Sequence, residues 1–272
     1  MSKIKIHQFH SGSAYGDAVT NSLLYTQKFL QELGFESEIY CEHVAPQLKD
    51  KILHYSKYKT SQENILLLHH SMGHDLEEWI LSLKEKIVLV YHNITPHDFF
   101  PKDSPFHHYC IKGREQLEMF KKIVHASIGD SKLNVDELLD VGFAEEKTEV
   151  IPLLIEYDKI KNHPWNYKLF DENTNTYNIL FVGRIAPNKG QFELIELFDL
   201  FKKLSPLPSK LFLVGGTSDK NYEQSLHDLI DEKNLQDFVH ITGKVPYEDL
   251  YAYYRASDVF VCLSEHEGFG VP

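Results

Sequence analysis

The stretch Asn178–Phe198, NILFVGRIAPNKGQFELIELF, constrains the fold of this chain most strongly. Its apolar run Ile179–Val182 is typical of a buried strand, Gly183 breaks the run, and apolar residues recur at helical spacing from Phe192. The stretch therefore predicts a strand, a tight glycine turn and a helix. In an open α/β sheet, such a turn lies at the carboxyl end of the strand, where ligands bind.

Two cations in this turn indicate that the ligand is an anion. A helix N-terminus offers unpaired N–H groups and the positive end of the helix dipole. Arg184 adds a guanidinium that can bind two phosphate oxygens, and Lys189 adds a mobile ammonium. The pattern is typical of a diphosphate site. The alternative is an ordinary strand–helix junction with two solvated cations.

The rest of the chain also alternates strands with helices, which predicts parallel sheets with right-handed crossovers. The strands are apolar runs rather than alternating ones, as expected where helices cover both sheet faces. Strands are predicted at 3–9, 35–41, 64–69, 87–91, 123–127, 149–152, 179–182, 210–214, 238–242 and 259–263. Helices are predicted over 23–33, 76–83, 114–122, 133–139, 192–197, 222–232 and 247–256.

A polar stretch separates two such alternations. Residues 153–176 contain Pro164 and several asparagines and lose the apolar periodicity, which predicts a linker. We therefore expect an α/β protein of two Rossmann-like, doubly wound domains, at 1–152 and 177–272, with a cleft between them.

Composition excludes several classes of function. The 272 residues include 40 acidic and 28 basic ones, so the net charge of −12 argues against a nucleic-acid partner. Cys41, Cys110 and Cys262 have no disulfide or zinc spacing, and Cys41 and Cys262 end apolar runs typical of buried thiols. With no signal-peptide region and no apolar run of membrane-spanning length, we expect a cytoplasmic protein. Peripheral association with the inner face of the plasma membrane stays open.

Four stretches together resemble the retaining glycosyltransferases of family 4, which have the GT-B fold. They are YHNITP (91–96), VIPLLIEYD (150–158), LFVGRIAPNKG (180–190) and SEHEGFGVP (264–272). The likeness follows the family's order through nearly the whole chain, and YHNITP is most similar to transferases that build bacterial polysaccharides. The resemblance implies transfer of a sugar from a nucleotide diphosphate donor to a glycan or lipid-linked acceptor. GDP-mannose is favoured as the donor over a UDP-sugar.

The resemblance also implies roles for residues at the strand ends. Arg184, Lys189 and Gly16 would hold the donor diphosphate, while His92 and Glu267 would be the catalytic residues at the donor sugar. Three further groups complete the expected site: the donor-sugar loop Gly268, Phe269 and Gly270, the nucleobase contacts Gly243, Lys244 and Val245, and the candidate acceptor contacts Tyr15, Asp17 and His70, with His69 as the alternative to His70.

The expected mechanism is a front-face, retaining displacement in which the leaving phosphate oxygen helps to take the acceptor proton. His92 would position and stabilise. No cofactor is expected, and transfer should be independent of metal because no Asp-x-Asp-like pair follows a strand. The histidine-rich HHSMGH (69–74) lacks a carboxylate at helical spacing, so no metal site is predicted there.

One part of the family pattern is missing. Glu267 matches the first glutamate of an E-x7-E motif whose second member would stand at 275, beyond Pro272. We therefore expect an incomplete second domain, with weak nucleotide binding and little transfer. Two other functions stay open: a nucleotide-sugar epimerase of the same fold, which would need further acid/base carboxylates, and a nucleotide-binding fragment without turnover.

Overall fold

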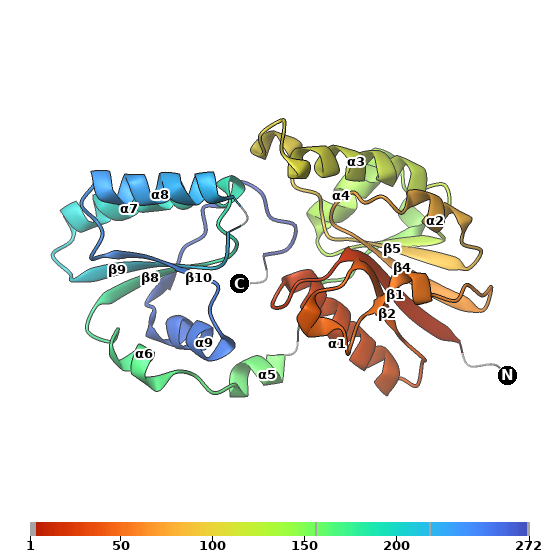
Figure 1. Cartoon of the computed structure of the whole chain (residues 1–272), viewed down its shortest axis with the longest axis horizontal. Coiled ribbons are helices and arrows are strands. Elements are labelled where there is room, and N and C mark those ends of the chain that lie inside the picture. Colours follow the sequence, from red (N-terminus) through yellow and green to blue (C-terminus); the bar gives the residue numbers. More distant parts are fainter. Residues whose placement is uncertain (1–3, 156, 218, 271–272) are drawn as a thin grey trace. The chain divides into compact units, whose positions relative to one another are not determined.

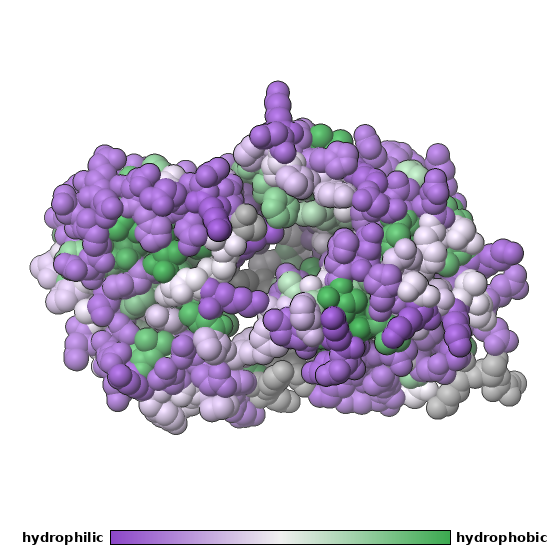
Figure 2. All heavy atoms as spheres, viewed as in Figure 1, coloured by the Kyte–Doolittle hydropathy of each residue, from purple (hydrophilic) through white to green (hydrophobic). Residues whose placement is uncertain are grey.

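The computed structural model describes residues 4–155, 157–217 and 219–270, which form two compact α/β units (Figure 1). Unit 1 comprises the described residues of 1–156 together with those of 267–271, and unit 2 comprises those of 157–266. Hydrophilic side chains cover most of the visible face of each unit (Figure 2). The boundary between the units falls inside the polar stretch 153–176.

Unit 1 is built on a seven-stranded parallel sheet with the strand order β3-β2-β1-β4-β5-β6-β7. The strands are β1 (Lys5–Gly12), β2 (Ile39–His43), β3 (Leu53–His54), β4 (Asn64–His70), β5 (Lys86–Tyr91), β6 (Ala126–Gly129) and β7 (Thr148–Val150). The helices are α1 (Ala18–Glu32), α2 (Glu77–Ser82), α3 (Pro105–Phe120) and α4 (Lys132–Val141), with short 3-10 turns at Pro46–Leu48, Tyr55–Lys57, His97–Phe99 and Glu145–Lys147.

Helices cover both faces of this sheet, as its apolar strands require (Figure 1). On one face, Phe9, Leu68 and Leu89 pack with Leu117 and Phe120 of α3. On the other face, a smaller cluster joins α1 to β2 and the chain after it; its buried members are Leu23, Ile39, Cys41, Leu48 and Ile52. The two clusters hold the strands of unit 1 rigidly, which fixes the positions of the residues that follow them.

Unit 2 is built on a four-stranded parallel sheet with the order β10-β9-β8-β11. The strands are β8 (Tyr177–Val182), β9 (Ser209–Val214), β10 (Val239–Gly243) and β11 (Val259–Phe260). The helices are α5 (Tyr157–Asn162), α6 (Tyr167–Asp171), α7 (Gln191–Leu204), α8 (Lys220–Glu232) and α9 (Tyr247–Ala256), with a 3-10 turn at Pro187–Lys189. Helices α7 and α8 cover one face of the sheet, and Leu250 and Tyr253 of α9 pack on the other.

The structure corrects several sequence-based boundaries. Helix α3 begins at Pro105, nine residues before the predicted start, because Ser104 caps it and proline is favoured in a first turn. Strand β6 starts at Ala126 because the N–H groups of Ile123 and Val124 still bond to Phe120 O at the end of α3.

Two further expectations are wrong, and the predicted linker 153–176 contains the short helices α5 and α6. Helix α6 is capped by the Asn166 side chain, which accepts from Leu169 N. β11 is only two residues long and ends before the predicted residue 263. Cys262, expected to be a buried thiol, is exposed, whereas Cys41 is buried as expected.

A close approach of α3 to the loop after β4 depends on two glycines. A Cβ atom on Gly113 would lie 2.6 Å from Gly73 N and 2.9 Å from Ile94 Cδ1. The same approach lets His70 Nε2 donate a hydrogen bond of 2.9 Å to Gly113 O. The C-terminal end of β4 and the loop after it are therefore held against α3.

We expect Gly113→Ala to destabilise the protein, although alanine in a helix interior usually stabilises by about 1 kcal/mol relative to glycine. The added methyl overpacks a backbone contact, and the expected loss is about 1–3 kcal/mol in the free energy of unfolding. Urea unfolding measures it. Exposed Glu115 of the same helix provides the control, since Glu115→Ala should stay within about 0.5 kcal/mol of wild type. A Gly113→Ala variant as stable as this control would contradict the inferred packing.

Candidate functional site

A row of polar side chains crosses the carboxyl edge of the unit 1 sheet. His10 lies on β1, His69 on β4, His92 directly after β5 and Asp130 directly after β6. These strands are consecutive neighbours in the sheet, and parallel strands end at the same edge. Residues from four distant parts of the sequence are thereby brought side by side.

His92 and Asp130 are joined at the centre of this row. His92 Nδ1 lies 2.6 Å from Asp130 Oδ2, and each of the two side chains is only 2% exposed. Because a carboxylate only accepts hydrogen bonds, Nδ1 of His92 carries a proton and donates it. His92 Nε2 lies 2.8 Å from His69 Nδ1, and the planes of the two rings are inclined by only 10°. Both ring nitrogens of His92 are therefore bonded within unit 1.

The histidines beside this pair are held neutral by burial. His10 donates from Nδ1 to Gly12 O and accepts at Nε2 from Ser71 Oγ, 2.9 Å away. Burial lowers the pKa of His10 to about 4, with His92 adding to the effect against the opposing hydrogen bond to Gly12. Burial, with smaller contributions from His92 and His10, also lowers the pKa of His69 well below 6.5. Neither ring carries a charge at neutral pH.

The backbone after His92 turns sharply. Asn93 has a left-handed φ of 70°, and its side chain donates to Asn134 Oδ1 at 3.0 Å. Asn134 in turn donates to Tyr91 O at 3.2 Å. These two buried asparagines fix the turn, so the position of His92 does not depend on its ring contacts alone.

The donor-sugar loop predicted from EGFG lies on this turn within unit 1. Gly268 O accepts a hydrogen bond of 2.9 Å from Ser131 Oγ, the N-cap residue of α4. A Cβ atom on Gly268 would lie 2.5 Å from His92 O. Only glycine allows the backbone to approach His92 this closely. The structure therefore brings Gly268, with its neighbours Glu267 and Phe269, to the predicted catalytic histidine.

The turn predicted to bind phosphate connects β8 to α7 in unit 2. Gly190 has a left-handed φ of 66° and offers α7 no side-chain cap, while Phe192 N in the first turn donates to Tyr222 Oη at 3.3 Å. Arg184 is exposed, and its carbonyl accepts from Gln191 Nε2 at 2.9 Å. Lys189 Nζ lies 3.4 Å from His266 O, so the chain after β11 contributes to the position of this ammonium. The two predicted phosphate-binding cations lie in the turn that leads into the N-terminus of α7.

Glycines let the backbones of the loops in unit 2 approach one another closely at the carboxyl edge of its sheet. A Cβ atom on Gly215 would lie 1.8 Å from Gly183 O. The Gly215 N–H donates to Gly243 O at 3.1 Å, and Ile185 N donates to Gly216 O at 3.0 Å. Of the predicted nucleobase residues, Gly243 ends β10 and Lys244 follows it, so both lie at the edge that holds the β8–α7 turn. Val245, the third of them, packs into the apolar cluster under α9.

The first loop of unit 1 holds the other predicted residues. Tyr15, Gly16 and Asp17 are exposed, and Gly16 has a left-handed φ of 76°. Asp17 caps α1, since its Oδ2 accepts from Thr20 N at 3.0 Å. A solvent-facing contact from His70 is wrong for this structure. Its ring is 1% exposed and packs on Phe120 on the face opposite His69.

Sequence reasoning did not single out Asp130, Asn134 or Ser131. The segment IGDSKLN (128–134) could have pointed to them, because Asp130 follows a buried strand and Ser131 stands where a helix N-cap is favoured. His92 was predicted as a site residue because it directly follows strand β5, just as Asp130 directly follows β6. Among the described residues, no group of three or more His, Cys, Asp or Glu side chains is arranged to hold a metal ion.

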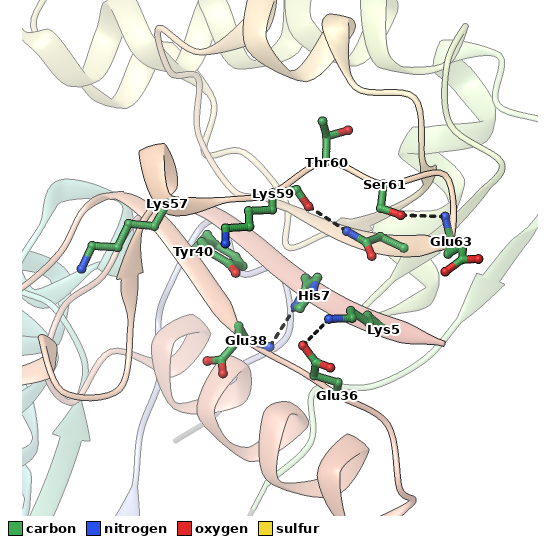
Figure 3. Close-up of a pocket in the computed structure, with 11 residues that line it drawn as sticks. Lys5, His7, Glu36, Glu38, Tyr40, Lys57, Lys59, Thr60, Ser61 and Glu63 are labelled. Atoms are coloured by element: carbon green, nitrogen blue, oxygen red, sulfur yellow. Dashed lines mark hydrogen bonds and ion pairs between the residues drawn. The ribbon is translucent and has the colours of Figure 1, made fainter. Parts of the chain in front are cut away.

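A separate pocket lies near the opposite edge of the unit 1 sheet (Figure 3). Its volume is about 330 Å³, and it is lined by charged and polar residues near the amino ends of β1 and β4, among them Lys5, His7 and Asn64. Lys5 pairs with Glu36 at 2.6 Å across its rim. None of the residues predicted to bind the donor lines it.

Comparison with known proteins supports a glycosyltransferase fold. Residues 168–272 match the family model described as glycosyl transferases group 1. The structure resembles that of HepE from Anabaena in complex with UDP and glucose, with a TM-score of 0.74 and 15% identity, covering 98% of this chain and 76% of that one. It also resembles a glycosyltransferase from Rickettsia africae, with a TM-score of 0.70 and 18% identity over 97% and 74% of the two chains. The predicted α/β class with Rossmann-like parallel sheets is confirmed.

Sequence relatives match a shorter part of the chain. The GDP-mannose:cellobiosyl-diphosphopolyprenol alpha-mannosyltransferase of Xanthomonas oryzae pv. oryzae is 38% identical over 93 residues, which are 34% of this chain and 24% of that protein. The mannosylfructose-phosphate synthase of Agrobacterium fabrum is 35% identical over 97 residues, 34% of this chain and 21% of that protein. The matched segment thus spans about a quarter of the length of these relatives. Within the described residues, no helix is long and apolar enough to cross a bilayer.

The buried histidines predict that acid destabilises the protein. Burial lowers the pKa of His10 and His70 to about 4 and that of His74 to about 3. Below pH 6.5 the unfolded chain binds protons that the folded chain does not, so the free energy of unfolding should fall as the pH drops from 6.5 toward 4. Each histidine contributes up to about 1.4 kcal/mol per pH unit.

Urea unfolding at pH 7, 6 and 5 measures this effect. His74→Gln removes one of the three histidines and should make the pH dependence shallower. Equal stability at pH 7 and pH 5 would show that these rings are not held neutral.

Proposed function

We propose that this chain forms part of a glycosyltransferase that moves a sugar from a nucleotide diphosphate donor to a glycan or lipid-linked acceptor. The observation that carries the proposal is the β8–α7 turn, with Arg184, Lys189 and a helix N-terminus whose N-cap residue is a glycine, inside the segment 168–272 that matches the group 1 family model. The proposed mechanism retains anomeric configuration and needs no metal. A membrane-linked acceptor would bring the protein to the inner face of the membrane.

Departure of the nucleoside diphosphate is the step that unit 2 would serve. The leaving group gains negative charge as the glycosidic bond breaks, and fixed positive charge lowers that barrier most when it is in place before reaction. The N-terminal end of α7 supplies oriented N–H groups and the dipole. Arg184 and Lys189 add two full charges, and the contacts of the loop with Gln191 and His266 hold it in position.

The sugar and the acceptor would meet the polar row of unit 1. Both ring nitrogens of His92 are already bonded, to Asp130 and to His69, which supports a positioning role rather than direct proton transfer by this ring. Gly268 places the backbone of the EGFG loop on His92, and Glu267 is the carboxylate proposed to contact the donor sugar. The leaving phosphate oxygen helps to take the proton of the acceptor hydroxyl.

We also propose GDP-mannose as the donor. The Xanthomonas relative whose name includes GDP-mannose is 38% identical over a 93-residue segment, and YHNITP is similar to enzymes of bacterial polysaccharide synthesis. The HepE structure contains UDP, which makes a UDP-sugar the competing choice. At 15% identity, that structure informs the fold and not the base.

Removing either cation should weaken binding of a nucleoside diphosphate. We expect Arg184→Ala and Lys189→Ala each to lose about 1.5–3 kcal/mol of binding free energy, because each removes charged hydrogen bonds to phosphate. Isothermal calorimetry with GDP and UDP measures this. Lys203→Ala is the control: Lys203 lies near the other end of α7, pairs with Asp199 at 2.7 Å and is 68% exposed, so affinity should not change. Unchanged affinity in both test variants would refute the proposal that Arg184 and Lys189 bind the diphosphate.

Competition between nucleotides tests the choice of donor. We expect GDP to inhibit transfer from labelled GDP-mannose more strongly than UDP does, since GDP carries the base of the proposed donor. Transfer to a polyprenol-diphosphate-linked glycan should continue in the presence of a chelator. Stronger inhibition by UDP would reverse the choice of donor, and activity restored only by manganese would refute metal independence.

A further inference from the structure

Helix α7 carries an apolar stripe on the side that faces away from the sheet of unit 2. Its members, Leu197, Leu200 and Leu204, are 46%, 52% and 77% exposed, whereas Ile195 and Phe198 of the same helix are buried in the core. At about 100° of rotation per residue, the three leucines project about 140–200° around the helix from Ile195. The leucine stripe therefore points into solvent and takes no part in the packing of unit 2.

The neighbouring helix shows that such a stripe is particular to α7. Helix α8 packs on the same face of the sheet (Figure 1), and every exposed residue within it is polar. Helix α8 is thus an ordinary surface helix with one apolar face. Helix α7 has two apolar faces on opposite sides, and an exposed apolar surface of this kind is typical of an interaction site.

Two opposite charges lie along one flank of the leucine stripe. Glu196 and Lys203 are seven residues apart, which is close to two full turns, so they project from the same side of α7. Their side chains are 52% and 68% exposed. Within unit 2, Glu196 Oε1 lies 3.9 Å from Lys233 Nζ, and Lys203 Nζ lies 2.7 Å from Asp199 Oδ2. Because more than half of each side chain remains in water, and an ammonium has three donors, both can engage a further partner.

We propose that the leucine stripe joins two copies of this chain, with α7 packed antiparallel to α7 of the partner subunit about a twofold axis near Leu200. Such an axis places Leu200 against Leu200 of the partner subunit, and Leu197 against Leu204 of the partner subunit. It also places Glu196 against Lys203 of the partner subunit, on the same flank of the helix pair. Apolar side chains then meet apolar ones and opposite charges meet twice, which is the self-complementarity that a twofold interface requires.

The charges around the leucine stripe favour a second copy over a membrane surface. Glu193 is exposed one turn before Leu197, and Glu196 follows on the flank. Carboxylates at these positions are repelled by an anionic bilayer, whereas Lys203 of a second copy neutralises Glu196. The interface is small, so we expect a dissociation constant on the order of 10–100 μM. This association does not depend on the proposed sugar transfer.

Sedimentation of the full 272-residue chain between about 1 and 200 μM measures the association. We expect monomer at the low end and dimer at the high end. Leu200→Glu places a charge at the twofold axis and should raise the dissociation constant at least roughly tenfold. Leu33→Glu is the matched control, because Leu33 is 58% exposed at the end of α1 in unit 1, and the dissociation constant should not change. A wild-type chain that stays monomeric, or a Leu200→Glu variant that dimerises as wild type does, would overturn the proposal.

Charge reversal tests the antiparallel register. In Glu196→Lys or Lys203→Glu alone, like charges face each other twice, so each variant should dimerise more weakly than wild type. An equimolar mixture of the two should associate more tightly than either variant alone, because one chain then carries two cations and the other two anions. Any effect on folding stays within each chain and is not relieved by mixing. A mixture that associates no better than its components would overturn the register. Binding of a monomeric wild-type chain to phosphatidylglycerol vesicles, lost in Leu200→Glu, would assign the leucine stripe to a membrane instead.

Discussion

Parallel pairing of strands is the constraint on which the rest of this structure depends. Because each strand runs in the same direction as its neighbours, every loop that follows a strand leaves from one edge of the sheet. In unit 1 that edge brings together His10, His69, His92 and Asp130, and in unit 2 it brings together the loops after β8, β9, β10 and β11. Each sheet thereby concentrates chemistry that is scattered along the sequence, without any single segment needing more than one or two functional side chains.

The close spacing of these loops depends on glycine residues, which have no side chain. Gly215 passes Gly183 O at a distance that no Cβ atom could accept, and Gly268 does the same at His92 O. Backbone groups therefore meet directly at both edges, where their hydrogen bonds are satisfied by one another or by neighbouring polar side chains. Such contacts explain why the motifs of the two units, VGR…NKG and EGFG, are rich in glycine as well as in charge.

Burial determines what the histidines can do. A ring within the sheet is kept neutral by the cost of bringing charge out of water, so His10 and His69 act through hydrogen bonds rather than charge. His92 differs because a buried carboxylate lies 2.6 Å from its ring. The two adjacent residues His69 and His70 illustrate the same rule. Successive strand residues face opposite sides of a sheet, so one joins the polar row and the other packs against α3.

The sequence by itself determined the alternation of strands and helices, the α/β class and the position of the β8–α7 turn. These follow from local patterns: apolar runs, glycine breaks and helical periodicity. The start of α3 and the short length of β11 could not be predicted, because caps and pairing with neighbouring strands decide them. His92, Arg184 and Lys189 could be proposed as site residues from the sequence because each stands within a motif at a strand end.

Only the tertiary structure decided which of these residues are neighbours. Asp130 stands in a similar position at the end of its strand, but its importance comes from His92, 38 residues earlier. The choice between His69 and His70 depended on which face of the sheet each one meets, and the role of Gly268 on its contact with Ser131, 137 residues away. Local sequence sets which elements form, whereas the pairing of distant strands sets which side chains become neighbours.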